Sequence, residues 1–206
     1  MTTSKRAFDI ALALVGVIIF VVPGLLIAIT LLVSQGRPIC YRSERMKTPG
    51  DSIQLWKFRT MRGAALNDGV SGGDKTARIT QVGQVLRRTR LDELPQLWNV
   101  LRGDISFVGP RPPLRQYVER FPQLYARVLQ SRPGITGLAT LVYHAREERL
   151  LAACTTAVET DAVYVAFCIP RKARLDLIYQ RKQSMRLDIS LLVKTVSRLF
   201  KRGRSA

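Results

Sequence analysis

An uncharged, mostly apolar run of 24 residues, positions 10–33, constrains this chain more than any other feature. About 20 apolar residues in a helix cross a hydrocarbon core of ~30 Å, so the run predicts a membrane segment. Pro23 lies near its middle, where proline removes a backbone hydrogen bond and kinks a helix. Two topologies stay open: a straight transmembrane anchor, and a re-entrant helix that bends at Pro23 and leaves through the leaflet it entered.

Basic residues flank the apolar run on both sides: Lys5 and Arg6 before it, and Arg37, Arg42 and Arg45 after it. Positive residues favour the cytoplasmic side of a membrane, and a straight span would export one of the two sets. The re-entrant helix keeps both sets on the cytoplasmic side. We expect Asp9, at the entry to the membrane, to pair with Lys5 or Arg6 at the interface.

The net charge of the chain is +18, from 33 Lys and Arg against 15 Asp and Glu. An excess this large predicts an anionic partner: nucleic acid, phospholipid headgroups or phosphorylated substrates. The aromatic residues do not alternate with the basic ones as binding of single-stranded nucleic acid requires. Because the chain also carries a membrane segment, we expect no nucleic-acid partner. The three cysteines are isolated from one another, which disfavours a disulfide framework or a zinc site.

The last segment, residues 171–206, is strongly basic and has apolar residues at near-helical spacing: Leu187, Leu191, Leu192, Val196, Leu199 and Phe200. This pattern is typical of an amphipathic helix at a membrane surface. A helix packed on the domain core with a solvated basic face gives the same pattern, and a DNA-binding arm fits it less well. We divide the chain into a membrane helix (1–36), a central domain at the cytosolic face (37–170) and a basic membrane-surface tail (171–206), together one integrated domain.

The central part predicts an α/β fold that is mostly helical with a few short strands. Residues 52–61 alternate partly, as a strand does, and residues 82–91 predict a short basic helix. Pro95 marks the start of a helix that ends near Leu101, because proline is favoured in the first turn. Residues 114–129 predict one amphipathic helix. A polar, glycine-rich loop covers residues 67–74, either as a flexible lid or as an ordinary surface loop.

Asp92 and Glu93 are adjacent acids in a basic stretch, just before this helix start. The free N–H groups and the dipole of a helix N-terminus favour anions, either these carboxylates or a phosphate. Five nearby arginines could offset the charge of a diphosphate: Arg87, Arg88, Arg90, Arg102 and Arg111. An ionised carboxylate here could attack phosphorus, and its neighbour could bind Mg²⁺. The alternative is that Asp92 is a plain N-cap and Glu93 a surface residue that complements the helix dipole.

Short stretches along nearly the whole chain form an ordered set of motifs. They are Lys5-Arg6-x-x-Asp9, Lys57-Phe58-Arg59-Thr60-Met61, Arg78-Ile79-Thr80-x-x-Gly83, Leu91-Asp92-Glu93-Leu94-Pro95-Gln96-Leu97, Asn99-Val100-Leu101-x-Gly103-Asp104, Val108-Gly109-Pro110-Arg111-Pro112 and Arg132-Pro133-Gly134-Ile135-Thr136-Gly137-Leu138-Ala139. Each motif is weak alone, but the ordered set is specific. The chain resembles a monotopic phosphoglycosyl transferase of the bacterial sugar transferase family, in its small catalytic form. It departs from the family at Val22, where a serine usually precedes the proline of the membrane helix.

The resemblance implies transfer of a sugar-1-phosphate from a UDP-sugar to polyprenyl (undecaprenyl) phosphate, with release of UMP, as the first membrane step of glycoconjugate assembly. It implies that Asp92 attacks the β-phosphorus and forms a covalent aspartyl-phosphosugar intermediate, which the lipid phosphate resolves. Glu93 is then the partner acid at a Mg²⁺ site that includes Asp92. The implied location is the cytoplasmic face of the bacterial inner membrane. Phosphoryl transfer depends on positioning and charge neutralisation, which suits an arginine-rich stretch.

Further substrate- or phosphate-binding residues are expected at Lys57, Arg59, Arg78, Arg88, Arg111, Thr136 and Arg146. For Lys57 and Arg59 a solvated sheet face is the alternative, whereas Arg111, held between two prolines, suits a fixed phosphate or uridine contact. His144, the only histidine, is expected to make a structural hydrogen bond. The stretch around His144 resembles relatives that use N-acetylated UDP-amino sugars, including UDP-diacetylated bacillosamine, more than it resembles hexose users.

Two other functions stay open on sequence. One is a non-enzymatic basic scaffold at the membrane surface that binds anionic lipid or nucleic acid. The other is a glycosyl transferase that leaves both phosphates with the nucleotide and therefore releases UDP in place of UMP.

Overall fold

The computed structural model describes residues 2–63, 70 and 72–204, with side chains described up to residue 198. The helical elements are α1 (Thr3–Gln35), η1 (Gly73–Arg78), α2 (Gln81–Thr89), η2 (Leu91–Glu93), α3 (Gln96–Arg102), α4 (Arg115–Arg120), α5 (Pro122–Val128), α6 (Leu138–Ala152), α7 (Ala157–Val163), η3 (Tyr164–Cys168), α8 (Ile169–Lys182) and α9 (Met185–Arg204). The strands are β1 (Cys40–Met46), β2 (Ser52–Phe58), β3 (Ser106–Val108) and β4 (Gly134–Thr136). The predicted class, mostly helical with a few short strands, is confirmed.

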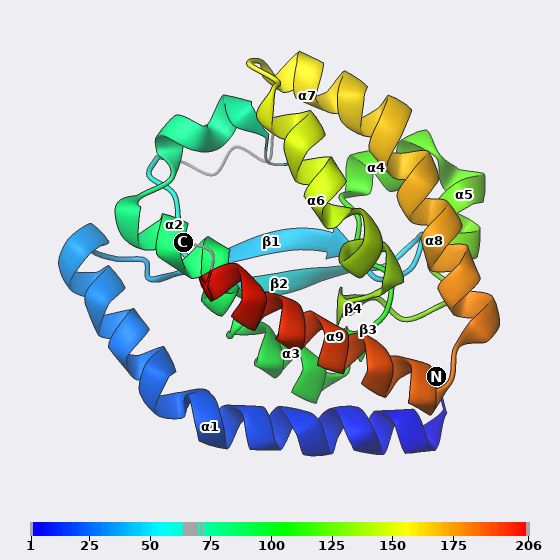
Figure 1. Ribbon diagram of the computed structural model, residues 1–206, viewed down its shortest axis with the longest axis horizontal. Coiled ribbons are helices and arrows are strands. Elements are labelled where there is room, and N and C mark those ends of the chain that lie inside the picture. The colour runs from blue at the N-terminus through cyan, green and yellow to red at the C-terminus, as the bar shows by residue number, and fades with distance from the viewer. Residues whose placement is uncertain (1, 64–69, 71, 205–206) are drawn as a thin grey trace.

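Two small sheets lie at the centre of the molecule, surrounded by helices (Figure 1). β1 and β2 form an antiparallel hairpin in which Cys40 pairs with Phe58 and Met46 with Ser52. β3 and β4 pair in parallel, and the chain between them passes through α4 and α5. The strand predicted within residues 52–61 is therefore confirmed as β2, and the helix predicted at residues 82–91 is confirmed as α2.

The apolar run lies in α1, which Figure 1 shows as two arms that meet at a bend. Pro23 lies inside this helix, as expected of a residue that kinks it. Both arms pack on the same domain. Ala13 of the first arm joins a core cluster with Val100 and Ile105, and Leu31 of the second arm packs in a cluster with Phe58 and Leu86.

Apart from these contacts, α1 presents a long exposed apolar surface: Leu14, Val15, Val17, Ile18, Ile19, Phe20, Val21, Val22, Leu25, Leu26, Ile29, Leu32 and Val33. By length and composition α1 could cross or insert into a membrane. A soluble surface rarely exposes so large a continuous apolar patch, because its hydration is unfavourable. Its burial in lipid removes that cost.

The first turns of α1 dock on the domain through polar contacts. The Lys5 ammonium lies 2.5 Å from Asp188 Oδ2 on α9, and both side chains are buried. Arg6 donates to the carbonyls of Val100 and Leu101, each at 2.6 Å, and so satisfies the C-terminal end of α3. Asp9 is fully buried and accepts a hydrogen bond from the Phe107 amide, 3.4 Å away.

The expectation that Asp9 pairs with Lys5 or Arg6 at the membrane interface is therefore wrong. Both cations have partners on α3 and α9, and Asp9 faces the chain at β3. The periodicity of the sequence places these residues on one helical face, but it contains no information about which distant elements that face meets.

The amphipathic helix predicted for residues 114–129 is two helices, α4 and α5. The break falls at Phe121, which has φ −130° and ψ 59°, and Pro122 begins α5. Proline disfavours the helical conformation in the residue before it and has no N–H to donate, so the continuous helix was the wrong prediction. The apolar face itself is confirmed, because Tyr117, Val118 and Tyr125 are buried.

The basic tail forms α8 from Ile169 onward, followed by α9, and Figure 1 shows both packed along the domain. Leu191 and Asp188 on α9 are buried, and Tyr179 on α8 donates to Asp188 Oδ1 at 2.7 Å. One face of α9 therefore belongs to the core, while Val193 and Val196 are exposed. Of the predicted glycine-rich loop, residues 67–69 and 71 lie outside the described residues, and Gly73 already belongs to η1.

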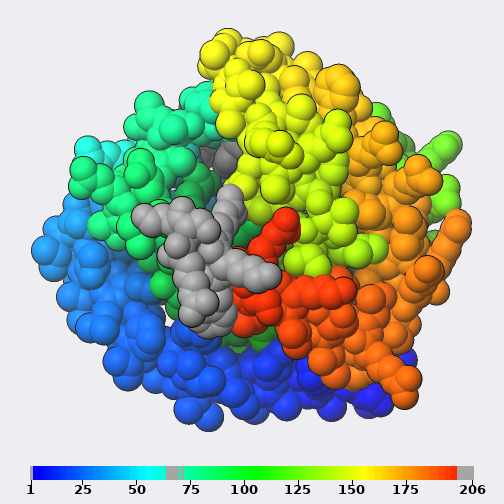
Figure 2. Space-filling model, viewed as in Figure 1, coloured from blue at the N-terminus to red at the C-terminus, as the bar shows by residue number. Residues whose placement is uncertain are grey.

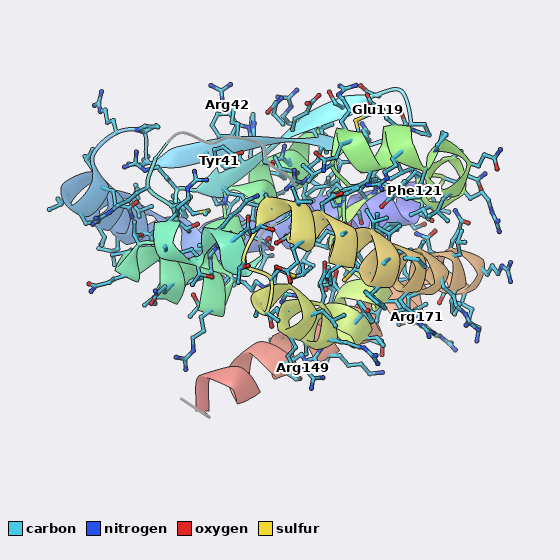
Figure 3. All side chains as sticks on the ribbon, turned by 90° about the horizontal axis from the view of Figure 1, so that it is seen from above. Tyr41, Arg42, Glu119, Phe121, Arg149 and Arg171 are labelled. Carbon is cyan, nitrogen blue, oxygen red and sulfur yellow. The ribbon has the colours of Figure 1, made fainter. Side chains whose placement is uncertain are left out.

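Much of the positive charge lies at the surface. Arg42, Arg149 and Arg171 are exposed and lie at the periphery of the view in Figure 3. Arg42 also lies over the ring of Trp56, 4.7 Å from its centroid.

Loss of one member of the buried Lys5–Asp188 pair is expected to destabilise the fold. Lys5→Ala leaves the Asp188 carboxylate buried without its cation, which typically costs about 3–5 kcal/mol. Chemical unfolding in detergent micelles measures the change. The control is Glu119→Ala, which removes an exposed ion pair with Arg115 and should change the free energy of unfolding by no more than about 0.5 kcal/mol. Equal losses in the two variants would contradict the structural role of Lys5.

Candidate active site

The local backbone places Asp92 and Glu93 between two helices. α2 ends at Thr89, and Arg90 adopts a left-handed conformation with φ 63° that turns the chain into η2. Asp92 and Glu93 lie in η2, and Pro95 occupies the position before α3, which confirms the predicted helix start. The acids therefore precede α3 without capping it, and the interpretation of Asp92 as a plain N-cap is wrong.

Glu93 is buried at the centre of a group of cations. Its Oε1 accepts hydrogen bonds from Lys57 Nζ at 2.9 Å and from Arg111 Nη2 at 2.8 Å. Arg90 Nη1 lies 3.7 Å from Oε2. Burial alone would raise the pKa of Glu93, but Lys57, Arg111 and Arg90 outweigh it and hold this pKa well below its usual value. Glu93 is therefore a fixed anion that orients three cations.

Asp92 is equally buried, with 7% of its surface exposed, but its environment differs. Within the described part of the chain, Asp92 Oδ1 is inaccessible to solvent and has no hydrogen-bond partner. Burial raises the pKa of Asp92, and Lys57 opposes this only in part. A buried carboxylate oxygen without a donor costs free energy and is typical of a functional group. Asp92 thus has an oxygen available for a bond that the protein itself does not supply.

Arg90 contacts a second helix as well as Glu93. Its Nη2 lies 2.6 Å from His144 Nε2 on α6, and the same Nε2 lies 3.3 Å from Glu148 Oε1. Figure 2 shows the segment that contains α2 facing α6 across a recess in the surface. The structural hydrogen bond expected for His144 is present, and it reaches the group that surrounds the acids.

Lys57 is positioned by a hydrogen-bonded connection between β2 and α3. Asn99 on α3 is buried, and its Oδ1 accepts from the Trp56 amide at 3.1 Å. Its Nδ2 donates to the Gln54 carbonyl and to Asp104 Oδ2, both at 2.9 Å. Because α3 follows the acids directly, this connection fixes the distance between Lys57 and Glu93. Asn99 was not among the expected site residues, although it begins one of the motifs.

Arg111 is positioned by close contact between two loops. Gly109 donates to the Thr136 carbonyl and Gly134 to the Pro110 carbonyl, each at 2.8 Å. A Cβ on Gly134 would lie 2.3 Å from the Gly109 nitrogen, so a side chain there would force the loops apart. The two proline- and glycine-containing motifs thus interlock and direct Arg111 at Glu93.

The other expected substrate-binding residues make contacts elsewhere. Arg59 donates to the carbonyls of Gln35, Gly36 and Arg37 at the end of α1. Arg78 Nε donates to the Arg62 carbonyl at 3.4 Å, and Arg78 lines a pocket of about 380 Å³ beside the start of α2. Thr136 pairs with Thr195 of α9 at 3.0 Å.

Arg88 and Arg146 are both exposed on their helices. Arg87 is half-buried and interacts electrostatically with Asp92 and Glu93. Arg87 and Arg90 are three positions apart, and Arg88 lies about 100° further around the helix than Arg87. Helical spacing alone could therefore have favoured Arg87 over Arg88.

The donor set limits how a metal can bind. Among the residues that the structure describes, no group of three or more His, Cys, Asp and Glu side chains could hold an ion. Mg²⁺ needs fewer protein ligands, because it keeps several waters and binds through one or two carboxylates plus substrate phosphates. Asp92 Oδ1 lacks a hydrogen-bond donor, and Glu93 Oε2 has only the longer contact with Arg90. These two oxygens fit such a site.

Comparison with known proteins agrees with this geometry. The model of the family described as bacterial sugar transferase matches residues 1–202. The chain belongs to the bacterial sugar transferase family. All the elements that place the two acids, from α1 to β4, lie within the matched residues of this bacterial sugar transferase.

Several relatives of this bacterial sugar transferase have assigned activities. A UDP-glucose:undecaprenyl-phosphate glucose-1-phosphate transferase of Caulobacter vibrioides is 34% identical over 95% of this chain and 69% of its own length. A transferase of the same name from Escherichia coli K12 is 36% identical over 95% of this chain and 40% of its own length. A UDP-N-acetylgalactosamine-undecaprenyl-phosphate N-acetylgalactosaminephosphotransferase of Aeromonas hydrophila is 30% identical over 93% of this chain and 42% of its own length. The chain thus spans about two-fifths of the length of the last two.

The opposite pKa shifts of the two acids predict opposite effects of neutralising them. Glu93 has a depressed pKa in the folded state, so its stabilisation is present above its usual pKa of 4.5 and is lost as pH falls through the folded value. Glu93→Gln should therefore lower the free energy of unfolding at neutral pH, and the difference from wild type should shrink in acid. Asp92 has a raised pKa, so Asp92→Asn should leave stability at neutral pH unchanged or higher.

Chemical unfolding of both variants across pH measures these effects. Equal destabilisation by the two substitutions at every pH would show that the acids share one environment and would contradict the divided roles.

Proposed function

We propose that this protein transfers a sugar-1-phosphate from a UDP-sugar to polyprenyl (undecaprenyl) phosphate and releases UMP. The observation that carries the proposal is the buried Asp92 carboxylate, with one unpartnered oxygen, beside a glutamate that fixes three cations. The names of the relatives describe transfers of this kind to undecaprenyl phosphate. The reaction would be the first membrane step of glycoconjugate assembly.

In the proposed mechanism a carboxylate oxygen of Asp92 attacks the β-phosphorus, the atom bonded to the sugar oxygen. The bond between this phosphorus and the bridging oxygen breaks, and UMP leaves with that oxygen. The product is an aspartyl-phosphosugar. An oxygen of polyprenyl phosphate then attacks the same phosphorus and displaces the carboxylate, which restores Asp92 and gives a polyprenyl diphosphosugar.

The cations around Glu93 supply what this chemistry needs. Phosphoryl transfer is accelerated mainly by positioning and by neutralisation of charge on the phosphate oxygens. Arg111, Arg90 and Lys57 are already held around Glu93, so the site needs little rearrangement when a diphosphate binds. Asp92 and Glu93 would together hold Mg²⁺, which would neutralise phosphate charge in the bound substrate.

The nature of the sugar follows less directly from the site. The relatives include both glucose and N-acetylgalactosamine transferases. We propose an N-acetylated amino sugar as the donor, with UDP-diacetylated bacillosamine as one candidate, because of the stretch around His144.

We also propose that α1 is re-entrant and that the protein is monotopic at the cytoplasmic face of the bacterial inner membrane. The bend in α1 and the docking of both arms on one domain support this topology, since a straight span would separate the arms. Most of the exposed apolar residues of α1 lie between the docked residues Ala13 and Leu31. The exposed basic face of the tail would then lie near the anionic headgroups.

Two alternatives differ in a measurable way. A non-enzymatic scaffold would form no product, and a glycosyl transferase would release UDP.

The purified protein, incubated with Mg²⁺, polyprenyl phosphate and a panel of UDP-sugars, is expected to release UMP. Asp92→Asn should abolish this release while the protein stays folded and bound to membrane. Turnover retained in that variant would rule out Asp92 as the nucleophile.

The covalent intermediate gives an independent test. When the lipid acceptor is omitted, intact-mass analysis should find an adduct of one sugar-phosphate on the wild-type chain and none on Asp92→Asn. The mass of the adduct identifies the sugar. UMP release without any adduct would favour direct transfer from donor to lipid.

The topology predicts that a tag at the N-terminus is accessible from the cytoplasmic side, together with a tag in the hairpin loop between β1 and β2. Protease digestion of inverted and right-side-out membrane vesicles compares the two tags. Accessibility of the N-terminal tag only from the periplasmic side would show that α1 crosses the membrane.

A further inference from the structure

One contact in the site is not used by the proposed reaction: the bridge from Arg90 to His144. It joins the backbone turn that carries the two acids to the middle of α6, 54 positions later in the chain. Arg90 Nη2 and His144 Nε2 are 2.6 Å apart, and the other terminal nitrogen of Arg90 faces Glu93. The guanidinium of Arg90 therefore lies between the imidazole and the carboxylate.

The chemistry of the two groups fixes the direction of this hydrogen bond. A guanidinium has only donors and stays protonated in proteins. Arg90 must therefore donate, and His144 Nε2 must accept, which requires a neutral imidazole with its proton on Nδ1. The same Nε2 lies 3.3 Å from Glu148 Oε1, which is an acceptor. Nε2 can thus bond to Arg90 when it is unprotonated, or to Glu148 when it is protonated, but not to both.

The charged groups that face His144 are Arg90, from the turn between α2 and η2, and Glu148, on α6 itself. On other elements near α6, five charged side chains have partners elsewhere: Lys75 with the Val70 carbonyl, Glu159 with Thr155, Asp161 with Arg120, Lys172 with Glu147 and Arg198 with the Leu141 carbonyl. Asp176 on α8 is buried, and its Oδ1 has no hydrogen-bond partner among the described residues. The choice at Nε2 is therefore between one cation and one anion.

We propose that His144 is a positioning residue for the reaction proposed above. The neutral imidazole holds the Arg90 guanidinium against Glu93, where it can meet a phosphate oxygen of the donor. Without this acceptor Arg90 loses its fixed position beside Glu93, so the enzyme loses activity when the hydrogen bond to His144 is removed.

The conformation of Arg90 supports this role independently. Arg90 is the one non-glycine residue with positive φ among the described residues. Glycine adopts this conformation more readily, so an arginine is retained here at a conformational cost. The side chain must therefore contribute something that glycine could not, and its described contacts are with Glu93 and His144.

The test compares His144→Ala and His144→Gln in UMP release. His144→Ala should lower kcat/KM about tenfold or more, as expected when a hydrogen bond to a charged group is lost. His144→Gln supplies an uncharged carbonyl acceptor at a similar reach, so it should retain most activity at neutral pH. Activity as low in His144→Gln as in His144→Ala would overturn the proposal.

A double variant tests whether His144 acts through Arg90. In an Arg90→Ala background, His144→Ala should cause little further loss, because the group it positions is already gone. Additive losses would overturn the proposal, since they would show that His144 acts independently. The control is Arg149→Ala, on an exposed position of the same helix (Figure 3), which should leave kcat, KM and the pH profile unchanged.

This inference rests on the proposed function, and the two can fail separately. Absence of UMP from the wild-type protein would refute the function. Normal turnover by His144→Ala would refute only the role of His144. Thermal unfolding of each variant confirms that the activities compared are those of folded protein.

Discussion

The docking of the first turns of α1 determines where the acids lie relative to the membrane. Lys5 is paired with Asp188 on α9, and Arg6 holds the carbonyls at the end of α3. α3 follows Asp92 and Glu93 almost directly, so Arg6 connects the membrane helix to the acids through one short helix. The packing of Ala13 and Leu31 then fixes both arms of α1 on the same domain. In the proposed reaction, a water-soluble donor and a lipid acceptor can meet at this site only if the acids keep a fixed height above the lipid.

The two neighbouring acids show how burial and nearby charges give adjacent carboxylates different properties. Glu93 has two hydrogen-bonded cations and a third nearby, which outweigh its burial and keep it ionised. Asp92, one residue away, has an oxygen with no donor, and its burial prevails. The environment of Glu93 stabilises the protein and orients the cations. The environment of Asp92 leaves the free-energy cost of a desolvated carboxylate uncompensated. Such a carboxylate gains more from a bond to an electrophilic phosphorus than a hydrated one does.

The sequence predicted local features well and distant contacts poorly. The kinked apolar helix, β2, α2 and the helix after Pro95 all follow from short-range patterns, and so does the adjacency of the acids. Lys57, Arg90 and Arg111 were expected near the phosphates, but local patterns could not show that they contact Glu93: Lys57 comes from a strand 36 positions earlier, and Arg111 from a loop 18 positions later. Arg59 lies near Lys57 in sequence but neutralises the end of α1, because β2 ends at Phe58. The predicted pairing of Asp9 with Lys5 or Arg6 was wrong for the same reason, because Asp9 accepts a hydrogen bond from Phe107 in the distant strand β3.

Arg90 contributes to the site through both its backbone conformation and its side chain. A left-handed, non-glycine residue costs about 1–2 kcal/mol, and here it produces the turn that presents Asp92 and Glu93 ahead of α3. The same residue donates its side chain to the site, so one position supplies both the backbone geometry and a cation. A glycine would give the turn without the cation, and a helical arginine would give the cation without the turn. The bond to His144 keeps the side chain from swinging into solvent, and this explains how a site built almost entirely from arginine, lysine and carboxylates comes to depend on the only histidine in the chain.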